Sequence, residues 1–279
     1  MQGKSLLNNI VKGVSGRVSK TFKNPYSDLN INFLKLKYLK HLPPGQIREH
    51  KLKDGVVSYR NAQELLHGFD EIFIQELYKI ELGANCYIID CGANIGLSVI
   101  YLKQLLPTAT ILAFEPDDQN FSLLSRNVSS FRFDNVELKN EAVWIENTTI
   151  GFTNEGSMSS KLDQNDTASK KIKASRLKDF LTKEVDFLKI DIEGAEYAVI
   201  KDVQEELINV QNLFLEYHGT FDQNRELVEI FNILSGSGFQ FYIKEATPVY
   251  KSPFFDSIQK SEKKDWDIQL NIFCFRNKS

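Results

Sequence analysis

The chain has 279 residues, 42% hydrophobic and 25% charged, a composition that excludes disordered, collagen-like and low-complexity proteins. Its longest apolar runs have four residues, whereas a membrane-spanning helix needs about 20. The net charge of −3 is divided unevenly, because residues 1–40 carry +7 and the remainder carries −10.

Residues 1–24 are basic and have apolar residues at helical spacing, but Asn8, Asn9 and Lys12 interrupt the continuous apolar stretch of a signal peptide. We expect either an amphipathic helix that contacts an anionic membrane face or a helix docked on its own domain. The three cysteines are too few for a disulfide framework, which favours the cytoplasm or its membrane face. The acidic remainder argues against nucleic acid as a partner.

Residues 1–84 are expected to form an N-terminal extension containing a hairpin and a helix. The hairpin is predicted over 46–61, around Asp54-Gly55, a dipeptide that accepts the positive φ angles of a tight turn. The helix that follows is predicted to end at Gly83. Its apolar stripe consists of Phe69, Ile72, Phe73, Leu77 and Ile80.

From residue 85 onward, short apolar strands alternate with amphipathic helices, a pattern typical of βαβ units and a mostly parallel sheet. Strands are predicted at 87–90, 110–115, 136–143, 187–191, 213–216, 239–244 and 268–275, and helices at 97–106, 118–129, 195–210 and 225–234. Residues 85–279 are therefore predicted to form one α/β domain. The polar stretch 151–182 is expected to be a mobile surface loop, either padding or an active-site lid.

The first strand runs into a glycine-containing loop, and ligands of parallel sheets bind beyond such strand ends. Asp90, Gly92, Asn94 and Gly96 define the spacing D-x-G-x-x-x-G, which differs from the G-x-G-x-x-G of dinucleotide sites. The acid at the strand end suits a cationic ligand better than a pyrophosphate. Asn94 is expected either to bind this ligand or to cap the next helix.

Glu115 ends the second strand, 23 residues after Gly92, where a carboxylate can accept from the ribose hydroxyls of an adenosine. Together with the loop at Asp90, it suits S-adenosylmethionine, whose amino-acid end is cationic. Asp117 is expected to cap the following helix.

The segments YIIDCGANIGLSVIYL, FEPD, VDFLKIDIEGAEYAVI and LFLEYHG resemble the FkbM family of S-adenosylmethionine-dependent methyltransferases, over residues 83–219. The resemblance implies a class I Rossmann-like fold, with a seven-stranded, mostly parallel sheet and an antiparallel last strand. It also implies O-methylation of a sugar, glycolipid or polyketide-like acceptor. The cofactor-binding residues that it implies are Asp90, Gly92, Ala93, Asn94, Gly96, Glu115, Pro116 and Asp117.

Carboxylates and an imidazole follow the later strands and should meet at one rim of the sheet. An alcohol needs a base or a metal to weaken its O–H bond, and we expect His218 or Asp191 to be the base, with Glu193 and Glu216 facing the acceptor. Lys189 is expected either to pair with Asp191 or to act near the acceptor.

Asp191, Glu216 and His218 are also candidate ligands for a divalent cation such as Mg²⁺. Two other functions stay open from the sequence. An NAD(P)-dependent oxidoreductase is disfavoured by the missing middle glycine of the loop. A non-catalytic nucleoside-binding or membrane-recruited scaffold would bind the cofactor without turnover.

Overall fold

The computed structural model describes residues 24–152, 170–255 and 265–276. The chain divides into two compact units, the first ending at Tyr78 and the second beginning at Lys79. The basic helix predicted within residues 1–24 lies outside the described residues, except for Asn24. No helix in the described ranges combines the length and the apolar character needed to cross a membrane.

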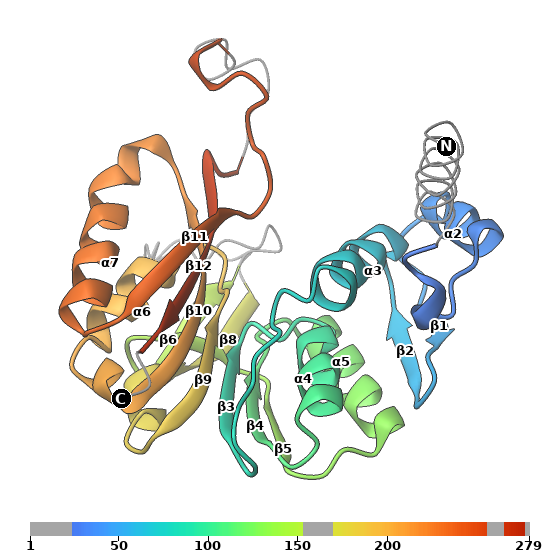
Figure 1. The fold of residues 1–279 in the computed structure, drawn as a ribbon, viewed down its shortest axis with the longest axis horizontal. Helices are drawn as coiled ribbons and strands as arrows, with labels where there is room; N and C mark the ends of the chain where they lie inside the picture. Colours follow the sequence, from blue (N-terminus) through green and yellow to red (C-terminus); the bar gives the residue numbers. More distant parts are fainter. Residues whose placement is uncertain (1–23, 153–169, 256–264, 277–279) are drawn as a thin grey trace, which may run out of the picture. The chain divides into compact units, whose positions relative to one another are not determined.

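The first unit consists of short helices around a two-stranded antiparallel hairpin (Figure 1). The predicted hairpin is confirmed, with Arg48 paired to Tyr59. The predicted turn geometry is wrong, because neither Asp54 nor Gly55 has a positive φ. Four residues instead connect the strands, and the amide of Leu52 donates to the carbonyl oxygen of Gly55 at 2.9 Å. The elements are η1 (Ser27–Leu29), α2 (Phe33–Lys40), β1 (Arg48–Lys51), β2 (Val56–Tyr59), α3 (Ala62–Gly68) and η2 (Phe69–Ile74).

The helix predicted around Phe69 begins earlier and ends earlier than the apolar stripe indicates. Asn61 caps the start of α3, its side chain accepting from the amide of Gln63. The helix continues as the π-helical segment η2, and Glu76 then adopts a left-handed φ of 55°. Leu77 and Ile80 are therefore outside the helix, because this backbone reversal ends it before Gly83.

A seven-stranded sheet in the order β11-β12-β10-β9-β3-β4-β5 forms the centre of the second unit. Six strands run in one direction, and β12 is antiparallel to both of its neighbours. This is the class I Rossmann-like architecture that the sequence predicts. The strands are β3 (Tyr87–Cys91), β4 (Thr110–Phe114), β5 (Val136–Lys139), β9 (Val185–Ile190), β10 (Val210–Gly219), β11 (Gln240–Glu245) and β12 (Ile268–Phe275).

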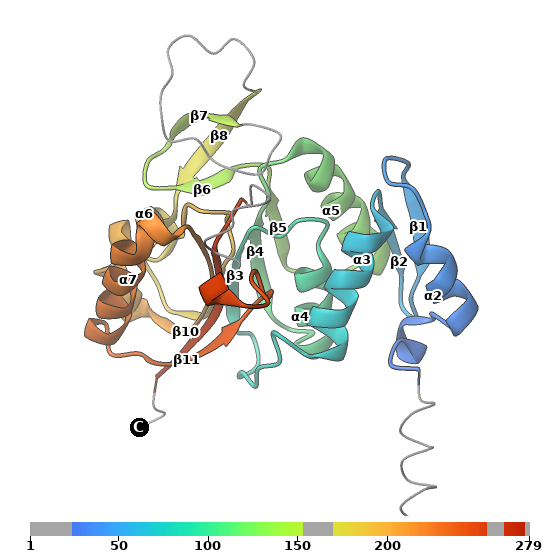
Figure 2. The same ribbon diagram turned by 90° about the horizontal axis from the view of Figure 1, so that it is seen from above.

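Helices cover both faces of this sheet, α4 (Leu97–Leu105) and α5 (Asp118–Phe131) on one side and α6 (Glu196–Asp202) and α7 (Asn224–Gly236) on the other (Figure 2). Alternate residues of the strands, such as Leu213 and Leu215, point into a buried core that includes Ile230 and Leu234 of α7. The 195–210 helix prediction is too long, because α6 ends at Asp202. A 3₁₀ turn, η4 (Glu206–Asn209), then leads into β10.

The strand predicted over 136–143 is two strands in different sheets. β5 ends at Lys139, and β6 (Ala142–Trp144) pairs with β8 (Lys170–Arg176), which also pairs with β7 (Thr148–Phe152). The prediction of a surface loop over 151–182 is therefore wrong at both ends, where β7, β8 and the turn η3 (Leu177–Phe180) lie. Buried Ile172 and Ala174 pack with Ala142 and stabilise this small sheet. Residues 153–169 lie outside the described residues.

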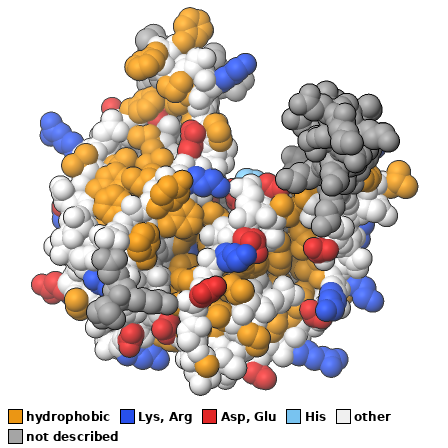
Figure 3. All heavy atoms as spheres, in the orientation of Figure 1, with side chains coloured by type: hydrophobic (Ala, Val, Ile, Leu, Met, Phe, Trp, Pro, Cys, Tyr) orange, Lys and Arg blue, Asp and Glu red, His pale blue; other side chains and the backbone are white. Residues whose placement is uncertain are grey.

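The outer strand β11 is exposed along its whole length. Apolar side chains gather over the region of β11 and α7 in the space-filling view (Figure 3). Phe241 of β11 stacks on Phe231 of α7, with ring centroids 5.3 Å apart, and this contact attaches the edge strand to the helix layer.

Candidate active site

The loop after β3 is shaped by two glycines. Gly92 and Gly96 have φ angles of 91° and 89°, values that L side chains rarely adopt. The amides of Gly92 and Ala93 donate to the carbonyl oxygen of Phe114, at 3.0 and 2.8 Å, which fixes the loop against the end of β4. No side chain caps α4, so Asn94 is not the helix cap that one sequence interpretation proposed.

Asp90 lies beneath this loop and is fully buried. One carboxylate oxygen accepts from the hydroxyl of Ser98 at 2.5 Å, and the other lies 3.2 Å from the ammonium of Lys189. Lys189 also donates to the carbonyl oxygen of Gly92 at 2.8 Å and lies 3.3 Å from the carboxylate of Asp191. Lys189 thereby links the glycine loop to Asp90 and to Asp191 at the end of β9.

Glu115 follows β4 directly and faces the same loop. Its two carboxylate oxygens accept from the backbone amides of Asn94, at 2.8 Å, and Asp117, at 3.0 Å. Burial raises the pKa of Glu115 to about 7, although these two amides oppose the shift. The carboxylate is therefore held in a fixed position and titrates near neutral pH.

A pocket of about 200 Å³ lies over the carboxyl ends of β3, β4 and β9. Of the eight predicted cofactor-binding residues, Gly92, Asn94, Glu115, Pro116 and Asp117 line it. Asp90, Ala93 and Gly96 are absent from the lining. Asp191 and Glu193, expected from the sequence to face the acceptor, also line the pocket. The remaining lining residues had no predicted role and are Phe114, Asn120, Ala142, Val143 and Ile192.

Asp117 has a second role at this rim. Its side chain accepts from the amides of Gln119 and Asn120, both at 2.9 Å, and so caps α5 as predicted. The cap places Asn120, in the first turn of α5, at the edge of the pocket.

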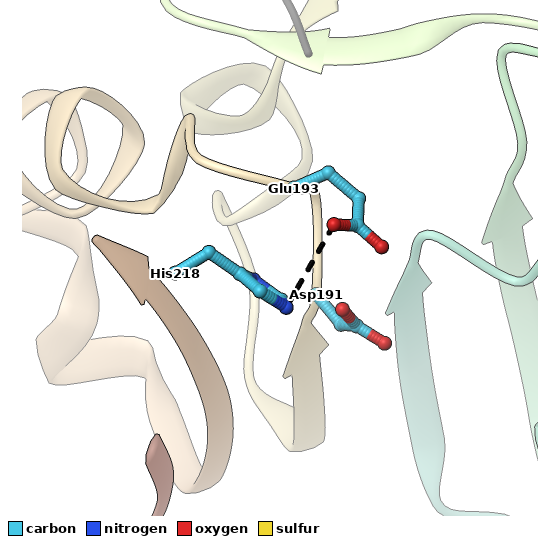
Figure 4. A group of neighbouring side chains, drawn as sticks. All are labelled: Asp191, Glu193 and His218. Carbon is cyan, nitrogen blue, oxygen red and sulfur yellow. Dashed lines mark ion pairs between the residues drawn. The ribbon is translucent and has the colours of Figure 1, made fainter. Parts of the chain in front are cut away.

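Asp191, Glu193 and His218 converge beside this pocket, from the loop after β9 and from the end of β10 (Figure 4). One ligand atom from each of the three lies within 4.8 Å of the other two. Glu193 has a left-handed φ of 56°, which directs its side chain back toward His218, and its side chain is 55% exposed. The three residues therefore present one imidazole and two carboxylates at a single position.

Carboxylates surround the imidazole of His218. Its Nδ1 lies 3.2 Å from the fully buried carboxylate of Glu196, and its Nε2 lies 3.5 Å from Glu216 and 3.8 Å from Glu193. Burial alone would lower the pKa of His218, but the hydrogen bonds and charges of these acids raise it to about 11. His218 is therefore a cation at neutral pH and balances part of the negative charge around it.

Glu196, which the sequence places in the same cluster of carboxylates at this rim but without an assigned role, organises the turn between β9 and α6. It accepts from the amides of Ile192, at 3.2 Å, and Gly194, at 3.0 Å, in addition to its contact with His218. The signal for it was present in the segment IEGAE, where an acid follows a glycine at the start of a helix.

The predicted metal set of Asp191, Glu216 and His218 differs from the geometry in one member. The atoms that approach within coordinating range belong to Asp191, Glu193 and His218, whereas Glu216 lies outside this group and pairs with the same Nε2 of His218 that faces Glu193. Oxygen ligands with one imidazole suit a hard divalent cation, but an imidazolium must first lose its proton to coordinate one.

Trp266 forms an aromatic wall beside His218, with ring centroids 5.7 Å apart. Its ring lies against Gly194, where a β-carbon would come within 2.5 Å of it. A residue 48 positions downstream of His218, in a stretch without a recognisable motif, offered no sequence signal for this contact.

Comparisons with known proteins find one matching family and several methyltransferase relatives. A model of the methyltransferase FkbM domain matches residues 90–241. Methyltransferase 1 of Beauveria bassiana is 28% identical over 198 residues, which cover 60% of this chain and 79% of the relative. Methyltransferase sdnD of Sordaria araneosa is 29% identical over 236 residues, covering 70% of this chain and 89% of the relative.

Among solved structures, methyltransferase FkbM from Methylobacillus flagellatus KT superposes with a TM-score of 0.46 and 18% sequence identity. The match covers 69% of this chain and 45% of that chain, so the present chain spans less than half of that solved protein.

Proposed function

The chain belongs to the FkbM methyltransferase family, and we propose that it transfers the methyl group of S-adenosylmethionine to a hydroxyl of a sugar, glycolipid or polyketide-like acceptor. Methyl transfer is the activity that its family and its methyltransferase relatives share.

The observation that carries the cofactor proposal is the position of Glu115 in the pocket formed by Gly92 and Asn94. A fixed carboxylate can accept hydrogen bonds from both hydroxyls of a ribose. The positive φ angles at Gly92 and Gly96 allow the backbone to approach a ligand closely, and Ala142 and Val143 add apolar surface suited to a purine. The carboxylate, the glycine loop and the apolar surface together therefore fit an adenosine with a charged tail.

The acceptor would lie on the other side of the pocket, near Asp191 and Glu193. S-adenosylmethionine supplies an electrophilic methyl group, and the acceptor oxygen must be aligned behind its carbon. In this transfer the O–C bond forms, the C–S bond breaks, and the hydroxyl proton moves to a protein base.

Glu193 is the base that we propose for this step. A protonated imidazole cannot accept a proton, so the high pKa of His218 argues against the base role that the sequence suggested for it. Partial burial raises the pKa of Glu193, His218 opposes the shift, and the neighbouring acids Asp191, Glu196 and Glu216 add to it. A carboxylate with a raised pKa is a stronger base, and exposed Glu193 can reach an acceptor that buried Glu196 cannot.

A divalent cation held by Asp191, Glu193 and His218 is the second route to an activated hydroxyl. The approach of their ligand atoms within 4.8 Å favours it. The imidazolium of His218 disfavours it, because that cation already neutralises the carboxylates a metal would bind. We therefore place proton transfer to a carboxylate first.

Calorimetric titration of the wild type and Glu115→Ala with S-adenosylmethionine, and separately with NAD, tests the cofactor assignment. Micromolar binding of S-adenosylmethionine that is lost in the variant supports it, and preferential binding of NAD overturns it. Glu184→Ala, which changes an exposed acid directly before β9, at the end of that strand away from the site, is the matched control.

A panel of glycan, glycolipid and polyketide acceptors, monitored by release of S-adenosylhomocysteine, tests the acceptor class. A product carrying an O-methyl group supports the proposal, and methylation only at nitrogen or carbon contradicts it. A cofactor complex with no turnover on any acceptor would instead favour the non-catalytic scaffold.

A further inference from the structure

Helix α2 presents large apolar side chains to solvent. Phe33, Leu34 and Tyr38 are 62%, 81% and 64% exposed. Exposed aromatic and aliphatic side chains interspersed with lysines can insert into a membrane interface while the lysines reach its anionic headgroups. From this surface we propose that α2 docks the protein on an anionic membrane, beyond the methyl-transfer function itself.

The exposed apolar residues share one side of α2. At about 100° per residue, Phe33, Leu34 and Tyr38 span roughly 140° of the helix circumference. Leu39 is 2% exposed and lies outside this sector, so the helix is held on its own unit by its opposite side. The apolar sector is therefore available to a second surface without removal of the helix from its fold.

The start of α2 is fixed, which keeps this sector in place. The side chain of Asn32 accepts from the amide of Lys35 at 2.8 Å and caps the helix. Ile31, just before the cap, is 1% exposed and anchors the chain that enters the helix. The apolar sector thus belongs to an ordered element with two buried anchors.

The charge around the sector complements an anionic surface. Lys35 and Lys40 flank the apolar side chains on the helix circumference, and Lys37 lies between Phe33 and Leu34. No acidic residue occurs from Leu29 to Arg48. Lysine stems can extend along the apolar surface while their ammonium groups reach lipid phosphates, so apolar insertion and charge attraction act at the same place.

This surface is separate in sequence from the basic segment 1–24, for which a membrane contact was also expected. A protein partner of matching shape would need acidic groups spaced to meet three lysines. A bilayer meets the same lysines with any anionic headgroup, and it accepts Phe33, Leu34 and Tyr38 without a shaped pocket. The observations therefore favour a lipid surface.

The test is flotation of the full-length protein with vesicles of phosphatidylcholine alone or phosphatidylcholine containing 25% phosphatidylglycerol. We expect binding to the anionic vesicles that weakens at high salt. The variant Phe33→Ser/Leu34→Ser/Tyr38→Ser should lose at least tenfold in affinity. Each lysine near an anionic surface strengthens binding about fivefold, so Lys35→Gln/Lys37→Gln/Lys40→Gln should lose on the order of 100-fold.

The control variant Ile208→Ser/Val228→Ser removes two similarly exposed apolar side chains from the second unit and should bind as the wild type does. Circular dichroism establishes that each variant is folded before its affinity is compared. Wild-type protein that stays unbound on anionic vesicles overturns the proposal, and so do α2 variants that bind as tightly as the wild type. Turnover of a dissolved acceptor should be the same in all of these proteins, which separates this test from that of the methyl-transfer function.

Discussion

A β-carbon on Gly92 would lie 1.8 Å from the backbone oxygen of Asp191, so the loops after β3 and β9 fit together only because residue 92 has no side chain. The same two loops carry the pocket for the proposed cofactor and the carboxylates of the proposed acceptor site. Because the two loops approach so closely, this one backbone contact sets the position of the proposed cofactor relative to the proposed acceptor.

The substitution Gly92→Ala is expected to reduce the free energy of unfolding by about 2–5 kcal/mol, from the left-handed φ and the clash together. Binding of S-adenosylmethionine should be lost as the loop moves away. Thermal unfolding and calorimetry measure the two effects. Gly83→Ala is the control, since nothing lies within 4 Å of its β-carbon position, and a Gly92→Ala protein as stable as this control would contradict the argument.

Lys189→Met should destabilise the fold by about 3–5 kcal/mol, because it leaves the buried carboxylate of Asp90 without its cation. Denaturant unfolding measures the loss. The double variant Asp90→Asn/Lys189→Met removes the uncompensated charge and should recover part of it. If the double variant is no more stable than the single one, the ion pair is not the source of the effect.

The affinity for S-adenosylmethionine should rise about tenfold between pH 6 and pH 8. Glu115, with a pKa of about 7, is mostly protonated at the lower pH and mostly ionised at the higher one, and the ionised carboxylate accepts from ribose hydroxyls more strongly. Glu115→Gln should lack this rise. Titration of the cofactor itself is common to both proteins, so equal pH profiles would show that Glu115 does not contact the ribose.

Replacement of His218 should affect stability in a pH-dependent way. Because its folded pKa of about 11 exceeds the ordinary value of 6.5, the imidazolium contributes its full stability below pH 6.5 and loses it as the pH rises toward 11. The melting temperature of the wild type should therefore exceed that of His218→Gln by more at pH 6 than at pH 9.5. His218→Ala should also lose turnover while it still binds cofactor.

Glu193→Gln should lower kcat by 10²- to 10⁴-fold, roughly the contribution of a positioned base, and change cofactor affinity less than twofold. Single-turnover assays with a saturating acceptor measure the chemical step. Glu184→Gln serves as the exposed control. Retention of full kcat in Glu193→Gln would move the base assignment to Asp191.

Activity should persist in excess EDTA, because a protonated His218 cannot coordinate a cation and already balances part of the charge of the neighbouring carboxylates. Turnover with and without the chelator, at matched ionic strength, checks this. Loss of activity that Mg²⁺ or Mn²⁺ restores would instead establish the cation route through Asp191, Glu193 and His218.

The sequence predicted the βαβ order, all seven strands of the main sheet and the pocket residues closest to the glycine loop, because these follow from local periodicity and strand ends. It could not predict that β6 leaves the main sheet, since Ala142 and Val143 read as a continuation of β5. The pairing that decides this comes from β8, where Ala174 and Ser175 lie opposite Ala142 and Val143 from 32 residues further along the chain.

The site, too, depends on contacts between distant residues that the sequence alone does not predict. Asp191, Glu193 and His218 were expected together because their strands are neighbours in a parallel sheet. The protonated state of His218 depends on Glu196, on a different element, and on burial that no spacing reveals. Trp266 can lie beside His218 only because Gly194 has no side chain to obstruct its ring, and the two residues meet only in the folded chain.

The position of β12 between β10 and β11 has a consequence for synthesis. β11 leaves the ribosome before β12, yet its pairing partner in the described sheet is β12, with Phe241 opposite Cys274. During translation, residues 240–245 lack their native pairing partner, and their apolar side chains stay uncovered, until residues 268–275 emerge and take the position between β11 and β10. A pause between these two strands would therefore prolong the period in which the nascent chain is most exposed to aggregation.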